Sequence, residues 1–304
     1  MSLRVLVVGS AAGGGLPQWN CNGDNSSLFW RGRHPPIAAT QSSLAVSSDG
    51  HDWILLNASP DIRQQIIARP QLQPRDPATH GLRDTPIRAV LLTNGDIDHI
   101  AGLLTLREKQ GFELVATAGI LDVLAANPIF DALDPALVGR RTVALDQPFD
   151  LIGEIAVELF AVPGKVPLYL EGESVDTEMI GEQTVGVEIS RDGSKIFYIP
   201  GCAAMTPALA KRLEGAELVL FDGTLWRDDE MIVQGLGQKT GKRMGHISMS
   251  GEDGSIAAFK GLDVRRKVFI HINNTNPVWR DGPERAEAEA AGWEIAYDGM
   301  EIPL

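Results

Sequence analysis

Cysteine is scarce in this sequence, with only Cys21 and Cys202 among 304 residues. Two widely spaced thiols cannot make a disulfide framework, so a disulfide-stapled secreted fold is excluded. Long hydrophobic runs are also missing, because no apolar stretch reaches the roughly 18 residues that a transmembrane helix needs. The first residues enter an apolar segment without the charged start and cleavage site of a signal peptide. We therefore expect a cytoplasmic protein that does not insert into a membrane.

Positive charge is the third shortage. Lysine and arginine number 27 against 40 aspartates and glutamates, which gives a formal net charge of −13. A surface this negative repels phosphate backbones, so we expect no nucleic-acid partner. Hydrophobic residues make up 44% of the chain, enough for a substantial core. Neither a linker nor a repeat divides the sequence, and we expect one domain over residues 1–304.

Strand and helix patterns alternate along the whole chain. Apolar segments predict strands at 3–9, 41–47, 52–56, 87–92, 113–117, within 141–162, and at 184–190, 195–199, 218–221, 268–272 and 293–296. Capping residues and helical spacing predict helices from Ser59-Pro60 and at 100–110, 119–126, 207–215, 254–261 and 283–291. Residues 18–37 are expected to be irregular, and the acidic stretch 171–182 is a candidate lid. The pattern favours an α/β (α+β) fold with two sheets between layers of helices, a four-layer αββα sandwich.

A run of three glycines, Gly13 to Gly15, follows the first predicted strand. Such a run lets the backbone adopt positive φ or approach another group closely. The spacing does not match the Gly-x-Gly-x-x-Gly of a dinucleotide-binding loop, and Leu16-Pro17 follows where a helix would have to begin. A nucleotide cradle is therefore disfavoured.

The most informative segment is Thr-Asn-Gly-Asp-Ile-Asp-His at 93–99. It places Asn94, Asp96, Asp98 and His99 between a predicted strand and a predicted helix. Metal ions are often held at such a junction, because the elements on either side fix the backbone. The alternative is that His99 belongs to an ordinary helix start and is satisfied there by Asp96.

Further chemistry-bearing residues stand at the ends of other predicted strands. Asp222 ends one strand, His271 ends another, and His246 lies in a glycine-flanked loop. Strands of one sheet end on a common edge, so these residues can converge with the 93–99 segment in a metal or acid–base site. A histidine bonded only to backbone is the alternative for His271. The remaining histidines, His34, His51 and His80, are expected at the surface.

The 93–99 segment resembles the Thr-His-x-His-x-Asp-His signature of the metallo-β-lactamase superfamily. Longer blocks narrow the resemblance: Pro-Gln-Trp-Asn-Cys-Asn at 17–22, Asn-Ala-Ser-Pro-Asp-Ile-Arg at 57–63, Val-Pro-Gly-Lys-Val-Pro at 162–167 and His-Ile-Asn-Asn-Thr-Asn-Pro at 271–277. Together they resemble the pyrroloquinoline quinone (PQQ) biosynthesis protein B family from end to end. The resemblance implies the αββα fold, and an iron- and oxygen-dependent hydroxylase acting on the tyrosine ring of a glutamate–tyrosine precursor.

Departures from the superfamily signature matter for the metal. Asn94 and Asp96 replace its first two histidines, and Cys202 stands where a bridging aspartate is usual. A binuclear hydrolytic site needs those ligands, so we do not expect one. Two histidines with a carboxylate suit non-haem Fe(II). We predict one divalent metal on Asp96, Asp98, His99 and His271, with Fe(II) favoured and zinc as an alternative in the purified protein; whether Asn94 and Asp96 ligate directly is left open.

Asp222 and His246 are predicted to act as catalytic groups that orient substrate or move protons, since histidine titrates near neutral pH. Cys21 lies where the family often carries Cys-x-Cys-x-x-Cys, of which two thiols are missing here, so we expect no structural zinc in this segment. Four further residues are predicted to contact the substrate or to support the site: Asn94, Lys165, Cys202 and Asn273.

Two other functions compete with the hydroxylase. One is a non-catalytic carrier of PQQ or its precursor toward the periplasm, with Arg63, Lys165 or Arg243 holding carboxylates. The other is a residual metal-dependent hydrolase, ranked last because of Asn94 and Asp96. The expected partners are a small-molecule or dipeptide precursor of PQQ and other proteins of the PQQ pathway.

Overall fold

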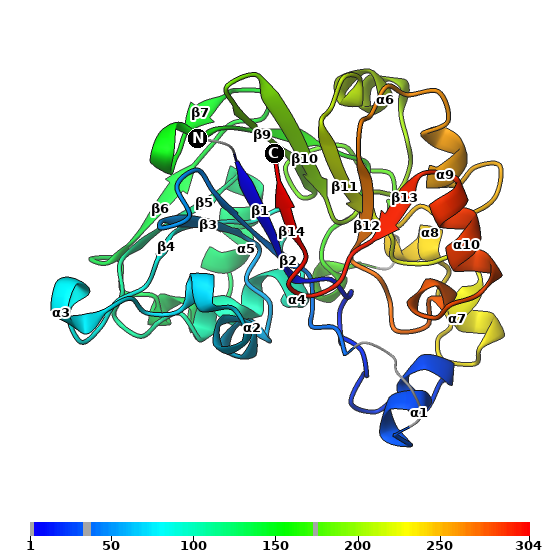
Figure 1. Ribbon diagram of the computed structural model, residues 1–304, viewed down its shortest axis with the longest axis horizontal. Helices are drawn as coiled ribbons and strands as arrows, with labels where there is room; N and C mark the ends of the chain where they lie inside the picture. Colours follow the sequence, from blue (N-terminus) through cyan, green and yellow to red (C-terminus); the bar gives the residue numbers. More distant parts are fainter. Residues whose placement is uncertain (1–2, 33–37, 173–175) are drawn as a thin grey trace.

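The chain forms two seven-stranded sheets (Figure 1). The computed structural model describes residues 3–32, 38–172 and 176–304. The first sheet is antiparallel from β14 to β3 and parallel from β3 to β6. Its strand order is β14 (Glu301–Pro303), β1 (Arg4–Gly9), β2 (Ser43–Ser47), β3 (Trp53–Leu56), β4 (Ile87–Leu91), β5 (Phe112–Ala116) and β6 (Val138–Thr142).

The second sheet is parallel from β13 to β10 and antiparallel from β10 to β7. Its strand order is β13 (Trp293–Ile295), β12 (Lys267–Ile270), β11 (Leu218–Asp222), β10 (Ser194–Ile199), β9 (Val185–Arg191), β8 (Ala156–Ala161) and β7 (Phe149–Asp150). Both sheets are therefore mixed. In each sheet, crossover connections join the strands that run parallel to one another.

Helices cover the two outer faces, and Figure 1 shows α2 and α5 on one flank and α6, α9 and α10 on the other. This confirms the four-layer αββα arrangement predicted from the sequence. The helices are α1 (Asp24–Trp30), α2 (Ile62–Ala68), α3 (Pro77–His80), α4 (Ile97–Ile100), α5 (Ala118–Ala125), α6 (Pro207–Leu213), α7 (Glu230–Val233), α8 (Gly241–Met244), α9 (Ser255–Ala258) and α10 (Pro283–Ala290).

Alternation along the strands of the second sheet divides the core in two. On β11, Leu218 and Leu220 face the core between the sheets, whereas Val219 and Phe221 belong to the outer core. Successive side chains of a β-strand point to opposite faces of its sheet, which explains this alternation. In the outer core, Trp293 stacks on Phe269 with ring centroids 3.8 Å apart. The helices thereby fix the sheet whose strand ends carry the candidate site.

Two predicted helices are corrected by the structure. The helix predicted over 100–110 is only α4 followed by a 3₁₀ turn at Ala101–Leu104. The amide of Gly102 donates to the carbonyl of Ala58 at 2.9 Å, which draws the backbone against the loop after β3 and ends the regular helix. The helix predicted from Ser59-Pro60 begins two residues later, at Ile62; Ser59 Oγ accepts from Asp61 N and donates to Gln65 Oε1, so it supports the turn that precedes the helix.

The segment 18–37, predicted to be irregular, contains α1. Long-range contacts hold this helix: Asn25 Nδ2 donates to the carbonyls of Asn274 and Asn276 at 2.7 and 2.9 Å. His34 lies outside the described residues, as do residues 173–175 of the candidate lid, while His51 and His80 are exposed. Within the described ranges, no helix has the length and apolar character that crossing a membrane demands.

Candidate metal centre

The candidate site is formed by the loops that follow β4, β11 and β12. The β4 loop carries Asp96, Asp98 and His99, while the ends of β11 and β12 carry Asp222 and His271. β11 and β12 are parallel neighbours, so their carboxyl ends lie at the same edge of the second sheet. The two sheets thus each bring one part of the site to this edge, as strand-end placement in the sequence predicts.

Asp98, His99 and His271 form one group whose potential ligand atoms all lie within 4.8 Å of one another. The Oδ2 atom of Asp98 lies 3.1 Å from His271 Nε2 and 3.9 Å from His99 Nε2. A carboxylate and two imidazoles whose donor atoms lie this close together can bind a divalent transition metal. Asp96 belongs to neither three-residue group found among the described residues, and its role as a ligand stays a prediction.

Hydrogen bonds on the far side of each imidazole orient the two histidines. His99 Nδ1 donates to the side-chain oxygen of Asn94 at 2.7 Å, and Thr93 supports it from 3.5 Å. Its Nε2 is therefore the unprotonated nitrogen, and this atom is buried without any hydrogen-bond partner among the described residues. A buried acceptor left unpaired in this way costs free energy unless a cation takes the lone pair. The site thus fits a metal ion.

Thr224 orients His271 and was not singled out from the sequence. Its hydroxyl donates its one proton to Asp222 Oδ1 at 2.7 Å, so it can only accept from His271 Nδ1 at 2.8 Å. His271 Nδ1 therefore carries a proton, and Nε2 donates to Asp98 Oδ2 at 3.1 Å; a metal ion bound here would replace the proton on Nε2. The only sequence signal for this role was the position of Thr224 just after a strand that ends in an aspartate.

Backbone geometry brings the glycine run against the same group. His271 adopts a φ of +59°, an unfavourable conformation for a side-chain-bearing residue that is held by bonds from Ile272 N to Ser10 O and from Ala12 N to Ile272 O. A Cβ atom on Gly13 would lie 3.4 Å from Asp98 Oδ2, so the loop passes directly beside this carboxylate. The close approach expected of the glycine run is therefore an approach to Asp98.

Electrostatics prepare the group for a cation. Burial opposes ionisation of Asp98, but its electrostatic interaction with His99 and the hydrogen bond from His271 outweigh burial and hold the pKa of Asp98 below its usual range. Burial lowers the pKa of His99 to about 4, so this imidazole is neutral at physiological pH. Burial first and then the charge of Asp98 raise the pKa of Asp96. Ionised Asp98 and neutral His99 are the forms that bind metal.

Asp222, His246 and His271 form the second group of convergent ligand atoms. His246 Nδ1 donates to Asp222 Oδ2 at 2.7 Å, and the His246 ring stacks on His271 with centroids 5.3 Å apart. Asp222 is fully buried and also accepts from the backbone N–H of Cys202. An imidazole fixed at Nδ1 by a buried carboxylate presents its Nε2 for proton transfer.

His246 lies in the wall of a cleft of about 710 Å³. A small molecule in this cleft would therefore lie against His246. Its lining includes backbone and side chains from the segments that follow β10, β11 and α8. Among the lining residues are Ala203, Met205, Arg227, Lys242, Ser248 and Glu178.

The remaining predicted residues have distinct surroundings. Lys165 Nζ lies 3.0 Å from Glu171, and the Asn273 amide donates to Met231 Sδ rather than to a site carboxylate. Burial, and then the charge of Asp222, raise the pKa of the Cys202 thiol, which makes it a poor nucleophile. Cys21 Sγ contacts Asn274 Oδ1 at 3.6 Å and belongs to neither ligand group of the described residues, so the absence of a zinc clip there stays a prediction.

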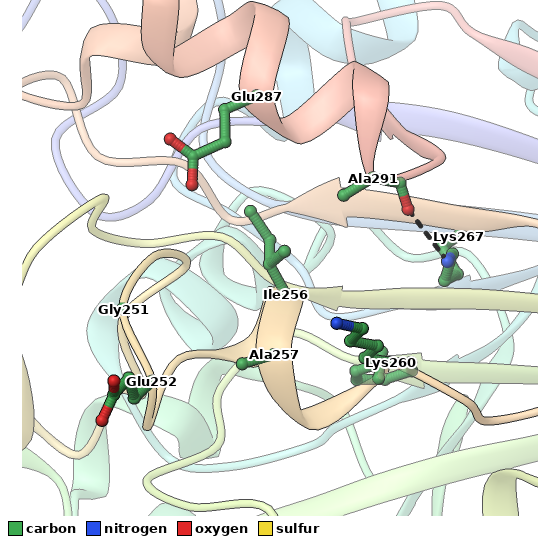
Figure 2. A pocket seen from close by; sticks show the side chains of 9 residues that line it. Gly251, Glu252, Ile256, Ala257, Lys260, Lys267, Glu287 and Ala291 are labelled. Carbon is green, nitrogen blue, oxygen red and sulfur yellow. Dashed lines mark hydrogen bonds between the residues drawn. The ribbon is translucent and has the colours of Figure 1, made fainter.

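A second cavity, of about 540 Å³, lies between α9 and α10 (Figure 2); it shares Gly251 and Glu252 with the lining of the cleft and contains neither ligand group. Its floor is apolar, with Ile256 and Ala257 from α9 facing Ala291 at the end of α10. Lys267 Nζ donates to the Ala291 carbonyl at 3.2 Å, shown as the dashed line in Figure 2. None of the residues that line it is a predicted site residue.

Replacing Thr224 by valine is expected to weaken metal binding by roughly 10- to 100-fold, the usual cost of losing a group that orients a ligand histidine. Valine keeps the shape but cannot accept from His271 Nδ1. The affinity for Zn²⁺, measured by competition with a chromophoric chelator, tests this. Thr224→Ser retains the hydroxyl and should retain the affinity; equal affinity of the valine variant would contradict the orienting role.

Comparison with known proteins agrees with this geometry. Residues 52–272 match the family model of the beta-lactamase superfamily domain. The coenzyme PQQ synthesis protein B of Rhizobium meliloti (strain 1021) is 53% identical over 302 residues, which cover 99% of this chain and 98% of that protein. The protein of the same name from Ruegeria pomeroyi is 58% identical over 303 residues, covering 99% and 100%.

Solved structures give the same picture. The structure of Zn²⁺-bound PqqB from Methylobacterium extorquens superimposes with a TM-score of 0.96 at 54% identity, covering 99% of this chain and 100% of that one. A diphosphatase of the PhnP family superimposes with a TM-score of 0.71 at 19% identity, covering 100% and 98%, and shares the fold.

The double sheet, with carboxylates and histidines gathered at its strand ends, therefore defines a member of the β-lactamase superfamily. Sequence identity above 50% along nearly the whole chain then narrows the assignment from the superfamily to one of its families. Within that superfamily the chain belongs to the coenzyme PQQ synthesis protein B family, which confirms the resemblance seen in the sequence.

Proposed function

We propose that this protein acts in PQQ synthesis as a metal- and oxygen-dependent hydroxylase of the tyrosine ring of a glutamate–tyrosine precursor. The observation that carries the proposal is the convergence of Asp98, His99 and His271, with the Nε2 of His99 buried and unpaired among the described residues. Two imidazoles and one carboxylate leave open positions on a metal, as non-haem Fe(II) sites require. The family names support the place in PQQ synthesis.

The metal would be held by Asp98, His99 and His271, with Asp96 as a further carboxylate beside them. When bound, Fe(II) would supply the redox chemistry with O₂ that protein side chains lack. Asn94 and Thr224 hold the two histidine rings in place from behind. Rigid support of this kind fixes the orientation of the histidine ligands, so that the remaining coordination positions of the metal stay open to substrate.

The Asp222–His246 pair supplies proton transfer on the cleft side. Asp222 fixes the His246 ring through Nδ1, so Nε2 is free to take a proton from a phenol or an ammonium group of a substrate in the cleft. Buried Asp222 stabilises the imidazolium that results. Aromatic hydroxylation loses one ring proton, and a base at this position is suited to receive it.

The test is oxygen uptake by anaerobically purified protein loaded with Fe(II) and supplied with a Glu-Tyr dipeptide. One oxygen atom enters the ring and the other becomes water, so ascorbate is added as the source of two electrons. We expect uptake together with a product one oxygen atom heavier, and neither with Zn²⁺-loaded protein. Fe(II)-loaded protein that binds the dipeptide without consuming oxygen would exclude the hydroxylase.

A non-catalytic carrier of PQQ or its precursor is the second candidate function. It is favoured by a concentration of lysine and arginine beside the cleft, around Glu171. A carrier should bind PQQ equally well when His99 and His271 are both replaced. A hydroxylase should lose turnover entirely in that variant. Hydrolysis has less support, because Asn94 and Asp96 stand where the superfamily signature has two of its metal-binding histidines.

A further inference from the structure

Three basic side chains surround the carboxylate of Glu171, whose side chain is 8% exposed. Lys165, Lys239 and Arg243 lie 3.0, 3.2 and 3.0 Å from the carboxylate oxygens of Glu171. We call these three residues the cationic cluster. The bond from Arg243, with the two lysines adding to it and burial opposing, lowers the pKa of Glu171 to about 2. The carboxylate therefore carries one full negative charge against three positive ones.

The cluster has donors to spare. Arg243 donates to Glu171 only through Nη2, and its Nη1 is buried without a hydrogen-bond partner among the described residues. Among the described residues, Lys239 Nζ donates to Glu171, and Lys165 Nζ also donates to the carbonyl of Val166 at 3.2 Å. A structural ion pair needs one cation for one carboxylate. Within the described part of the chain, three cations thus surround one carboxylate, in a protein whose net charge is −13.

The cluster adjoins the candidate site. The stem of Lys165 lies against Gly245, where an added Cβ would come within 3.3 Å of Lys165 Cγ, and Gly245 directly precedes His246. The charge of Lys165 also acts on the carboxyl of Asp96. Lys242, the neighbour of Arg243 in α8, lines the cleft together with His246. An anion bound to the cluster would thus lie beside the proton-transfer histidine.

We propose that Lys165, Lys239 and Arg243 form a carboxylate-binding subsite next to the cleft residues Lys242 and His246, and that it selects substrates carrying two or more carboxylates. The inference rests on the proposed function in that it concerns the substrate of the same site. Arg243 offers the planar pair of donors that fits a carboxylate in two-point contact, and the lysines supply point charge. The cluster orients the acidic end of a precursor while its aromatic ring faces His246.

Binding to Zn²⁺-loaded protein tests the subsite without any turnover. Isothermal titration compares Glu-Tyr, which has two carboxylates, with Gln-Tyr-amide, which has none and nearly the same shape. Wild type should prefer Glu-Tyr by roughly ten-fold or more, the value of one charge-assisted hydrogen bond. Arg243→Gln and Lys165→Met should each reduce that preference, and both ligands binding alike to wild type would overturn the proposal.

A variant that is expected to bind the ligand more tightly distinguishes an effect on the subsite from simple misfolding. Glu171→Gln removes the one internal anion, so Glu-Tyr should bind more tightly than to wild type, and inorganic phosphate should compete only weakly. Arg266→Gln, which breaks a pair with Glu294 in β13, is the matched control and should leave binding unchanged. Unchanged binding in Glu171→Gln would mean that the cluster is purely structural. Because no oxygen chemistry is measured, failure here is separate from failure of the hydroxylase.

Discussion

Replacing His271 by asparagine is expected to lower metal affinity by roughly 100-fold or more, beyond the usual cost of losing a supporting group. His271 Nε2 lies 3.1 Å from Asp98 Oδ2, and no other side chain bridges β12 to the β4 loop at this point in the described structure. Asparagine is the better replacement, since it tolerates the positive φ of this position where alanine adds strain. Metal content after dialysis against a mild chelator, with circular dichroism as a check of folding, is the measurement.

Two matched variants decide which histidine group holds the metal. If the ion is bound by Asp98, His99 and His271, then His99→Asn should lose it as well, whereas His246→Asn should keep it and lose only turnover. The reverse pattern, with metal lost from His246→Asn and kept by His99→Asn, would place the ion on Asp222, His246 and His271 instead. That outcome would contradict the role given to Asp222 as the partner of a proton-transfer histidine.

The sequence allowed the fold and the convergence of the main candidate residues to be predicted, because both depend on local signals. An apolar run that stops at polar residues marks a strand end, and β4, β11 and β12 each stop in this way at Asn94, Asp222 and His271. β11 and β12 are parallel neighbours, so their ends meet at one edge by topology, whereas the approach of the β4 loop depends on how the two sheets pack. The αββα assignment also drew on the family resemblance, since alternation by itself does not distinguish two sheets from one.

The features that could not be predicted depend on contacts between distant residues. Glu171 meets Lys239 and Arg243 across 68 and 72 positions of sequence, and no local pattern indicates that pairing. The helix predicted at 100–110 ends early because Gly102 bonds to Ala58, a residue of another loop. Likewise, the role of Thr224 arises only where the ends of β11 and β12 meet. Tertiary hydrogen bonds decided each of these cases over local propensity.

The structure also links stability to pH through a buried carboxyl close to the site. Glu230, 4% exposed, accepts hydrogen bonds from Thr275 Oγ1 at 2.6 Å and from Trp226 N at 2.7 Å. It thereby ties the turn after β11 to the loop that follows His271. Burial, only partly offset by these bonds, raises the pKa of Glu230 to about 7 from 4.5.

Stability should therefore fall as the pH rises. Between pH 4.5 and 7 the folded protein keeps the Glu230 proton that the unfolded chain has released, so the stabilisation is full below the lower value and lost by the upper one. The loss from pH 5 to pH 8 should be about 2–3 kcal/mol in the free energy of unfolding. Because a glutamine at this position can accept from Trp226 N and donate to Thr275, Glu230→Gln should keep both bonds and abolish this loss.

Urea unfolding at pH 5 and pH 8 measures the difference between wild type and Glu230→Gln. Glu287→Gln, an exposed carboxyl of α10, is the control and should follow the wild-type pH dependence. Parallel curves for wild type and Glu230→Gln would show that Glu230 carries no excess proton in the folded state. If the loss is abolished as expected, the loop bearing His271 is held more firmly at low pH than at high pH. Metal release from the wild type should then quicken above neutrality, and in Glu230→Gln it should not.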